Sequence, residues 1–251
     1  MLKVELLHGP ATVLGGAAAS LRVSNTTTDE AIALRHALQK DVVVAAVNSV
    51  TFLAYDGPLE AEIVAHRFGQ LPIALCDTDD ASSLWNGSAG VNDSSSPPHD
   101  IATLEVAVTN SGAELMWVTS HDITCPRGRV RICHYRSDAE RRAARDVGFL
   151  VCPLLAGQTL RASASVVIGS ARTRDARWGA VFVAMKPTDL HDDFVSDEPD
   201  DAVAPTEFDF YIETTGAVTA LGAWRQALAA LSSQLKAVAA SATVRPLVHS
   251  H

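Results

Sequence analysis

Side chains that could bind a metal ion and activate a water molecule occur at three places in the sequence. They are the acids Asp77, Asp79 and Asp80, the pair His121 and Asp122, and the run His191, Asp192 and Asp193. All three groups lie in polar, loop-like stretches, and no known catalytic spacing links them. A metal-dependent hydrolase is therefore the least favoured function, and we expect no catalytic residue in this chain.

Cysteine is the other residue type that could do chemistry here. The chain has four cysteines, Cys76, Cys125, Cys133 and Cys152, and no two of them form a C-x-x-C pair. A zinc site would need cysteine or histidine from distant segments, and Cys125, Cys133 and His134 could contribute, although their spacing is not that of a zinc finger. We expect buried or idle thiols, with no metal and no cofactor; a zinc site stays the alternative.

Two early stretches place basic side chains on otherwise apolar helices. Residues 24–38 carry Arg35 and His36, and residues 65–72 carry Arg67, without a nucleophile, a phosphate loop or a metal-ligand pair. Such side chains make charge-assisted hydrogen bonds to carboxylates or backbone carbonyls of another protein. Arg67 has an internal alternative, which is to cap the carbonyls at the end of its own helix. Both stretches favour a protein that binds other proteins.

Composition limits the remaining classes. The chain has 251 residues, of which 47% are apolar and 20% charged, enough for one domain or two modest ones. Its longest apolar runs are far below the roughly 20 residues of a membrane helix, and the N-terminus lacks the apolar segment of a signal peptide. We therefore expect a soluble, intracellular protein that makes no membrane contact.

The net charge of −9 argues against broad affinity for nucleic acid, because phosphate binding needs a basic surface. The charge is uneven, since residues 127–145 are rich in arginine, whereas residues 77–80 and 189–201 are acidic. The basic segment is either a solvated loop or a local face that docks on an acidic partner.

Strands and helices follow one another in the first third of the chain. Residues 3–24 predict a β-hairpin, and the β-branched residues 42–52 predict a strand. Thr27 and Glu30 have the spacing of a capping box, which predicts that a helix begins at this point. A second helix is predicted over residues 59–68, and it is expected to stop at Gly69 with Pro72 just beyond.

The middle of the chain predicts mostly strands and loops. Residues 102–109 and 114–119 alternate around an Asn-Ser-Gly turn and predict a hairpin. Further strands are expected at residues 149–155, 159–168, 180–185 and 208–213. Loops are predicted over residues 77–100 and 188–206, and an exposed helix over residues 138–146.

The last element carries the clearest periodic pattern. Its apolar residues are Leu221, Trp224, Leu228, Leu231, Leu235 and Val238, which follow one another at intervals of 3, 4, 3, 4 and 3. This pattern predicts a long helix with one apolar stripe. The stripe either packs on the chain's own sheet or also meets a helix of a partner protein. Because the stripe is narrow, it favours contact with a partner helix.

Four short pieces between residues 24 and 74 carry a resemblance to known proteins: Ser24-Asn25, Leu34-Arg35-His36, and residues 45–50 and 62–73. With Leu34-Arg35-His36 in place of a Leu-Arg-Arg core, they resemble the assembly-subunit family of multisubunit RNA polymerases. Its members are bacterial alpha, its archaeal counterpart and the third-largest subunit of eukaryotic RNA polymerase II. Residues 155–161, 176–180 and 208–216 continue the resemblance in the right order. It therefore covers nearly the whole chain.

This resemblance implies an α+β fold in which an alpha-like dimerisation domain is interrupted by a mostly β insertion domain. The dimerisation domain would comprise residues 1–50 and 178–251, and the insertion domain residues 51–177. The sequence departs from the family at His36, which stands where the family has arginine. Residues 76–100 hold a single cysteine, so the zinc or iron–sulfur segment of some members has no counterpart.

The resemblance implies a non-catalytic scaffold subunit of a DNA-directed RNA polymerase, itself a nucleotidyltransferase complex. The six stripe residues would pair with a small alpha-like (L-like) subunit, while Arg35, His36 and Arg67 would dock the second-largest subunit, with the largest subunit also in the complex. DNA contact would be indirect, since no further DNA-binding domain is expected after the long helix. The alternative is a stand-alone homodimeric regulatory protein of the same fold. The expected location is nucleus or cytoplasm, or a viral particle or factory, because the divergence favours an unusual lineage or a large DNA virus.

Overall fold

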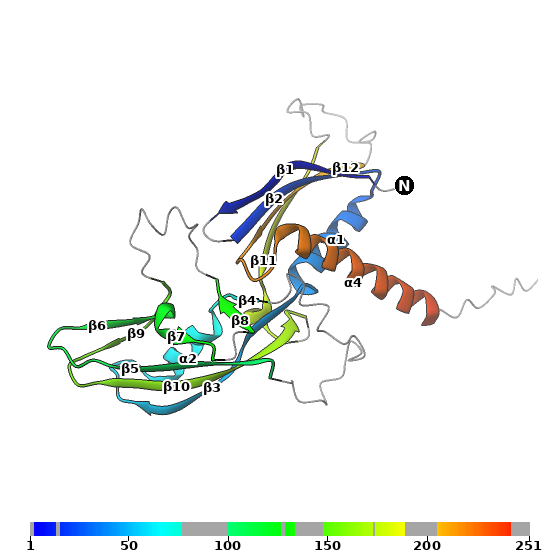
Figure 1. The fold of residues 1–251 in the computed structure, drawn as a ribbon. Helices are drawn as coiled ribbons and strands as arrows, with labels where there is room; N and C mark the ends of the chain where they lie inside the picture. Colours follow the sequence, from blue (N-terminus) through cyan, green and yellow to red (C-terminus); the bar gives the residue numbers. More distant parts are fainter. Residues whose placement is uncertain are drawn as a thin grey trace, which may run out of the picture.

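The computed structural model describes residues 3–13, 16–76, 100–126, 129–133, 148–172, 174–188 and 205–241. In this part of the chain, two antiparallel sheets and a two-stranded ribbon combine with three α-helices (Figure 1). The predicted mixed α+β class is confirmed. The helix predicted at residues 138–146 and nearly all of the two predicted long loops lie outside the described residues. No described helix is long and apolar enough to cross a membrane.

The first sheet brings the two ends of the chain together. Its strands, in spatial order, are β1 (Lys3–Val13), β2 (Gly16–Ser24), β12 (Glu207–Thr214) and β11 (Val181–Pro187), all antiparallel. The pairing of β1 with β2 confirms the hairpin predicted at residues 3–24. Alternate residues of β2 and β12 face one side of the sheet and are buried there, among them Leu21, Phe208 and Phe210.

Two helices from opposite ends of the chain cover that side of the first sheet (Figure 1). They are α1 (Thr28–Lys40) and α4 (Ala220–Ser241), which also pack on each other. The predicted capping box is confirmed, because Glu30 N donates to Thr27 Oγ1 over 3.3 Å and Thr27 N donates to Glu30 Oε2 over 2.9 Å. Asn25, with φ of 59°, makes the turn from β2 into α1.

Side-chain amides of α4 bind it to the short segment where α1 ends and β3 begins. Gln226 is buried and its Oε1 accepts a hydrogen bond from Val43 N over 2.8 Å. Farther along, Gln234 Nε2 donates to Asp41 Oδ2 over 3.0 Å, and Arg172 donates to both oxygens of the same carboxylate. Asp41 is nearly fully buried, so these partners satisfy a carboxylate that burial would otherwise penalise.

The second sheet has the order β7-β5-β10-β3-β4-β8. Its strands are β3 (Val43–Tyr55), β4 (Ile73–Leu75), β5 (Ala102–Thr109), β7 (Ile123–Thr124), β8 (Val130–Ile132) and β10 (Thr159–Ser170). A ribbon of β6 (Met116–Thr119) and β9 (Leu150–Leu154) packs with α2 (Ala61–Gly69) against this sheet around a second core.

The hairpin predicted from residues 102–109 and 114–119 is wrong. β5 pairs with β10 and β7, whereas β6 pairs with β9. Asn110, at the predicted turn, explains the difference: its Nδ2 donates to the carbonyls of Glu114 and Leu154, and its backbone N donates to Gln158 O over 2.9 Å. These bonds tie the turn to the segment after β9 instead of closing a tight hairpin.

The predicted stop of α2 at Gly69 is confirmed, but glycine is not there as a left-handed cap. Gly69 is the last residue of α2, and the cap is Gln70 in a right-handed conformation, so no left-handed glycine ends the helix. Glycine is needed here for space. A Cβ at Gly69 would lie 2.9 Å from Cδ of Arg177, a residue far along the chain.

β3 takes part in both cores. Val44 and Ala46 belong to the first core, while Ala45 and Val47, which point to the opposite face, belong to the second. The strand then continues to Tyr55 in the second sheet, past the boundary predicted at residue 50. The domain boundaries themselves stay a prediction.

The ion pair between Arg22 and Asp209 on the first sheet should make stability depend on pH. Arg22 Nε donates to Asp209 Oδ1 over 2.8 Å and Nη2 donates to Oδ2 over 3.1 Å, and these bonds hold the pKa of the Asp209 carboxyl below its ordinary value. In the unfolded chain the pKa of an aspartate is about 3.9, so the ion pair stabilises the folded protein fully above this pH. The stabilisation is lost as the pH falls through the lower pKa that Asp209 has in the folded protein.

We expect Asp209→Asn to flatten the fall in unfolding free energy between about pH 5 and pH 3, measured by urea denaturation. Arg22→Met is the matched control, because it removes the cause of the pKa shift and keeps the carboxyl. It should flatten the profile as well. Wild-type pH dependence in both variants would contradict this assignment.

Candidate functional site

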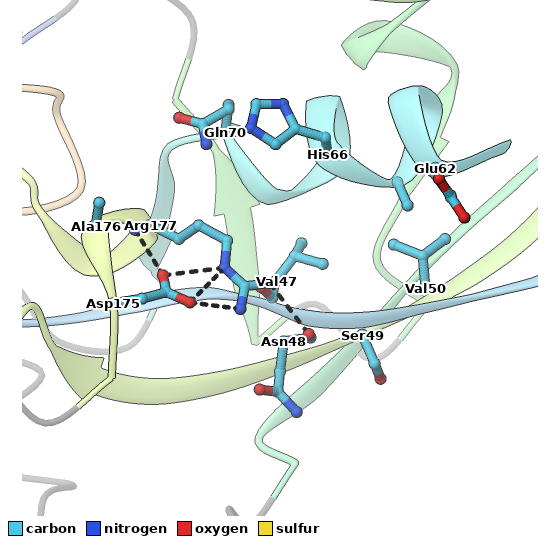
Figure 2. A pocket seen from close by; sticks show the side chains of 11 residues that line it. Val47, Asn48, Ser49, Val50, Glu62, His66, Gln70, Asp175, Ala176 and Arg177 are labelled. Carbon is cyan, nitrogen blue, oxygen red and sulfur yellow. Dashed lines mark hydrogen bonds and ion pairs between the residues drawn. The ribbon is translucent and has the colours of Figure 1, made fainter. Parts of the chain in front are cut away.

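A surface hollow of about 530 Å³ lies between α2 and β3 (Figure 2). One wall is the stretch of β3 at residues 47–50, and the other is formed by Glu62, Ala65, His66 and Gln70 of α2 and its cap. Residues 175–177, which include the start of the short 3-10 helix η3 (Ala176–Trp178), complete the lining. This hollow is called the α2–β3 groove below.

Arg177 ties one end of the groove together. Its Nη1 donates to the carbonyls of Asn48 and Val47 over 3.2 and 3.4 Å, and its Nε and Nη2 donate to the carboxylate of Asp175 (Figure 2). Those bonds from Arg177 hold the pKa of the Asp175 carboxyl below its ordinary value. The pair is therefore charged at neutral pH, and both of its charges are used within the chain.

An irregularity in β3 offers two consecutive carbonyls to one guanidinium. Ser165 of β10 lies opposite Ser49 and Val166 lies opposite Val47, so Asn48 has no partner and forms a β-bulge. A bulge locally reorients the backbone and often lies beside a functional site. The Arg177 contacts depend on this extra residue.

Trp178 anchors η3 in the interior. Its side chain is buried in the first core, and its Nε1 donates to Val167 O of β10 over 3.4 Å. The Arg177 guanidinium also lies over the Trp178 ring, 5.1 Å from its centroid. The buried tryptophan therefore fixes the direction from which Arg177 reaches β3.

Of the residues predicted to dock a large subunit, Arg67 is used inside the chain. It is half-buried on α2, and its Nη1 donates to Val151 O of β9 over 3.0 Å. It therefore joins α2 to the ribbon and does not cap its own helix end. Its docking role stays a prediction.

Arg35 and His36 lie elsewhere, on α1 over the first sheet. His36 is exposed and Arg35 is half-buried. The Arg35 Nε atom is buried and has no hydrogen-bond acceptor among the described residues. The three predicted docking residues are thus not brought together: two lie beside the first core and Arg67 beside the second.

The apolar stripe of α4 divides into two parts. Trp224 is buried and packs edge-on against Phe210, with ring centroids 5.5 Å apart. Leu221, Leu228 and Leu231 are partly buried against the same first core. Leu235 and Val238, by contrast, are 62% and 64% exposed on the half of α4 that projects from the fold (Figure 1).

Some of the residues considered for metal chemistry have structural roles or are buried. Asp122 Oδ2 accepts from Thr119 N over 2.8 Å and caps the 3-10 helix η2 (Ser120–Asp122). Burial raises the pKa of the Cys152 thiol to about 11, and Cys133 Sγ donates to Gly216 O over 3.2 Å. The described part of the chain holds no group of three or more potential ligands. Asp77, Asp79, Asp80, His134, His191, Asp192 and Asp193 lie outside the described residues.

Sequence reasoning missed the Arg177–Asp175 pair as part of a site. A signal existed, since residues 176–180 are one of the segments that resemble the polymerase family. Nothing in the sequence indicates, however, that this segment lies against residues 45–50 and 62–73. Those contacts cross more than a hundred residues of chain.

Comparison with protein-family models and with curated proteins yields no match for this sequence. No protein-family model matches it, and no curated protein matches it at a significant level.

Replacing Arg177 should destabilise the junction of α2, β3 and η3. We expect Arg177→Met to lower the free energy of unfolding by about 2 kcal/mol, because it leaves the Asp175 carboxylate without its partner and two carbonyls without a donor. Arg177→Lys keeps the charge but cannot reach all of these acceptors, so an intermediate loss is expected.

Urea denaturation followed by circular dichroism measures both changes. Arg225→Met, at an exposed arginine of α4, is the matched control and should retain wild-type stability. An Arg177→Met protein as stable as this control would show that the Arg177 contacts contribute nothing.

Proposed function

We propose that this chain is a non-catalytic assembly subunit of a DNA-directed RNA polymerase. In this role it pairs with a small alpha-like subunit through α4 and docks the second-largest subunit. The proposal starts from the segments that resemble the polymerase assembly family, and its chemistry is protein binding alone.

The observation that carries the proposal is the convergence of three of those segments. Residues 45–50, 62–73 and 176–180 lie apart in the sequence, yet they meet where Arg177 contacts β3 and fills the space beside Gly69. Resemblances that arose by chance would have no reason to contact one another. Their convergence supports a common structural origin.

The arrangement of α1 and α4 adds a second line of support. The resemblance implies a pairing domain built from both ends of the chain, and α1 and α4 do cover the same face of a sheet formed by both ends. In this arrangement α4 reaches beyond its own core and exposes Leu235 and Val238. Exposed apolar side chains in a regular stripe are typical of a helix that meets another helix.

Arg35 gives some support to docking at α1. The Arg35 Nε–H is a buried donor without an acceptor among the described residues, which costs about 1–3 kcal/mol. Because the Arg35 side chain is only half-buried, a carboxylate or carbonyl of a partner beside α1 can accept from its guanidinium. His36 is exposed next to it. Arg67 fits this role less well, because Val151 O already accepts from its guanidinium.

Pairing can be tested at the exposed half of α4. Leu235→Asp combined with Val238→Asp should weaken association with a co-expressed alpha-like subunit by about a hundredfold, since a carboxylate buried in an apolar seam is strongly unfavourable. Folding should be unaffected, because both side chains are mostly exposed in the single chain. Size-exclusion chromatography with light scattering measures the association.

Ser232→Asp combined with Ser233→Asp is the matched control, because both serines are exposed on the same helix outside the stripe. Trp224 is unsuitable for this test, since its side chain is part of the chain's own core. Pairing that survives the Leu235 and Val238 changes would contradict the proposal. A stable homodimer that ignores the alpha-like subunit would favour the stand-alone regulator instead.

A further inference from the structure

On the side of the α2–β3 groove, most of the hydrogen-bonding edge of β3 has no strand partner among the described residues. On its other edge it pairs with β10 from Val43 to Tyr55. On the groove side, within the described part of the chain, it meets another strand only where Ala45 lies opposite Ile73. An unpaired strand edge presents N–H and C=O groups that can pair with another extended chain.

Two bulges limit the usable part of this edge. Asn48 and Leu53 both lack partners on β10, whereas residues 49–52 between them keep a regular register. Bulges bend and twist a strand and so discourage open-ended pairing with other sheets. A stretch of regular edge between two bulges suits one short strand.

α2 supplies the opposite wall of the groove (Figure 2). Ala65 is part of this wall, and its side chain is small. Glu62, His66 and Gln70 flank it, and in the described part of the chain their side chains form no hydrogen bond or ion pair. Polar side chains on such a wall, beside a strand edge that no described strand pairs with, can contact the side chains of a segment bound to that edge.

The charges of the groove indicate what kind of segment fits. Arg177 is already neutralised by Asp175, and its bonds to Val47 and Asn48 close that end of the edge. The remaining carboxylate in the lining is Glu62, and Glu60 is exposed immediately before α2. The groove therefore carries an acidic surplus at the other end, which a basic side chain would complement.

We propose that the α2–β3 groove binds an extended segment of a partner protein, which adds as a strand to residues 49–52 and places a lysine or arginine beside Glu62. Backbone hydrogen bonds to β3 would provide affinity, and the α2 side chains would provide selectivity. This surface is separate from the exposed half of α4, and the proposal does not depend on the polymerase function.

The probe is a displayed library of random peptides of about ten residues, selected against the full chain and remade as labelled synthetic peptides. We expect the selected peptides to carry lysine or arginine. Ala65→Phe, which fills the groove, should weaken their binding at least about tenfold in fluorescence anisotropy, and Glu62→Lys should weaken it severalfold. Ile63→Phe is the matched control on the same helix, because Ile63 is exposed outside the groove and binding should be unchanged.

Hydrogen exchange separates strand addition from side-chain binding alone. Bound peptide should slow amide exchange within residues 49–52, because the added strand pairs with that edge. Unchanged exchange there would overturn the proposal, as would a selection that yields no peptide sensitive to Ala65→Phe. Self-association that is lost in Ala65→Phe and kept in Ile63→Phe would assign the groove to a second copy and likewise overturn it.

Discussion

The rest of the structure depends on the constraint that β3 serves two cores at once. Val44 and Ala46 face the first core, and Ala45 and Val47 face the second, so neither face of this segment can be exposed to water. β10, its antiparallel partner, is shared in the same way, with Val167 in the first core and Val166 in the second. A slip of one residue would exchange the two faces, so the burial of both faces fixes the register of this pair of strands in the second sheet.

The bulge at Asn48 marks the place where this shared segment ends. Arg177 donates to the carbonyls there, and the buried Trp178 holds Arg177 in position. Beyond the bulge, the buried side chains of β3 contribute to the second core alone, and its groove-side edge is free of any other described strand. The two surfaces suited to binding thus have different origins: the groove lies where β3 leaves the first core, and the exposed apolar residues of α4 lie where that helix extends past it.

The sequence predictions were correct for elements that depend on residues close together in the chain, and wrong where the decisive contact is distant in the chain. The capping box of Thr27 and Glu30, the first hairpin and the long α4 depend on neighbours within a few residues or on simple periodicity, and all three were predicted correctly. The hairpin around Asn110 failed, because that side chain bonds to Leu154 O, 44 residues away. The stripe of α4 was read correctly as apolar, but periodicity alone could not separate Trp224, inside the core, from Leu235, outside it.

The sequence alone determined the α+β class, most of the helices and strands, and the apolar stripe of the last helix. It also supplied the segments whose resemblance motivates the polymerase proposal. Only the tertiary structure decided that three of these segments meet at Arg177, that Arg67 donates to Val151 O, and that no described strand pairs with the edge of β3 beside α2 after Ala45. Local patterns encode secondary structure, whereas the pairing of distant strands and the use of each charge depend on contacts that no spacing along the chain specifies.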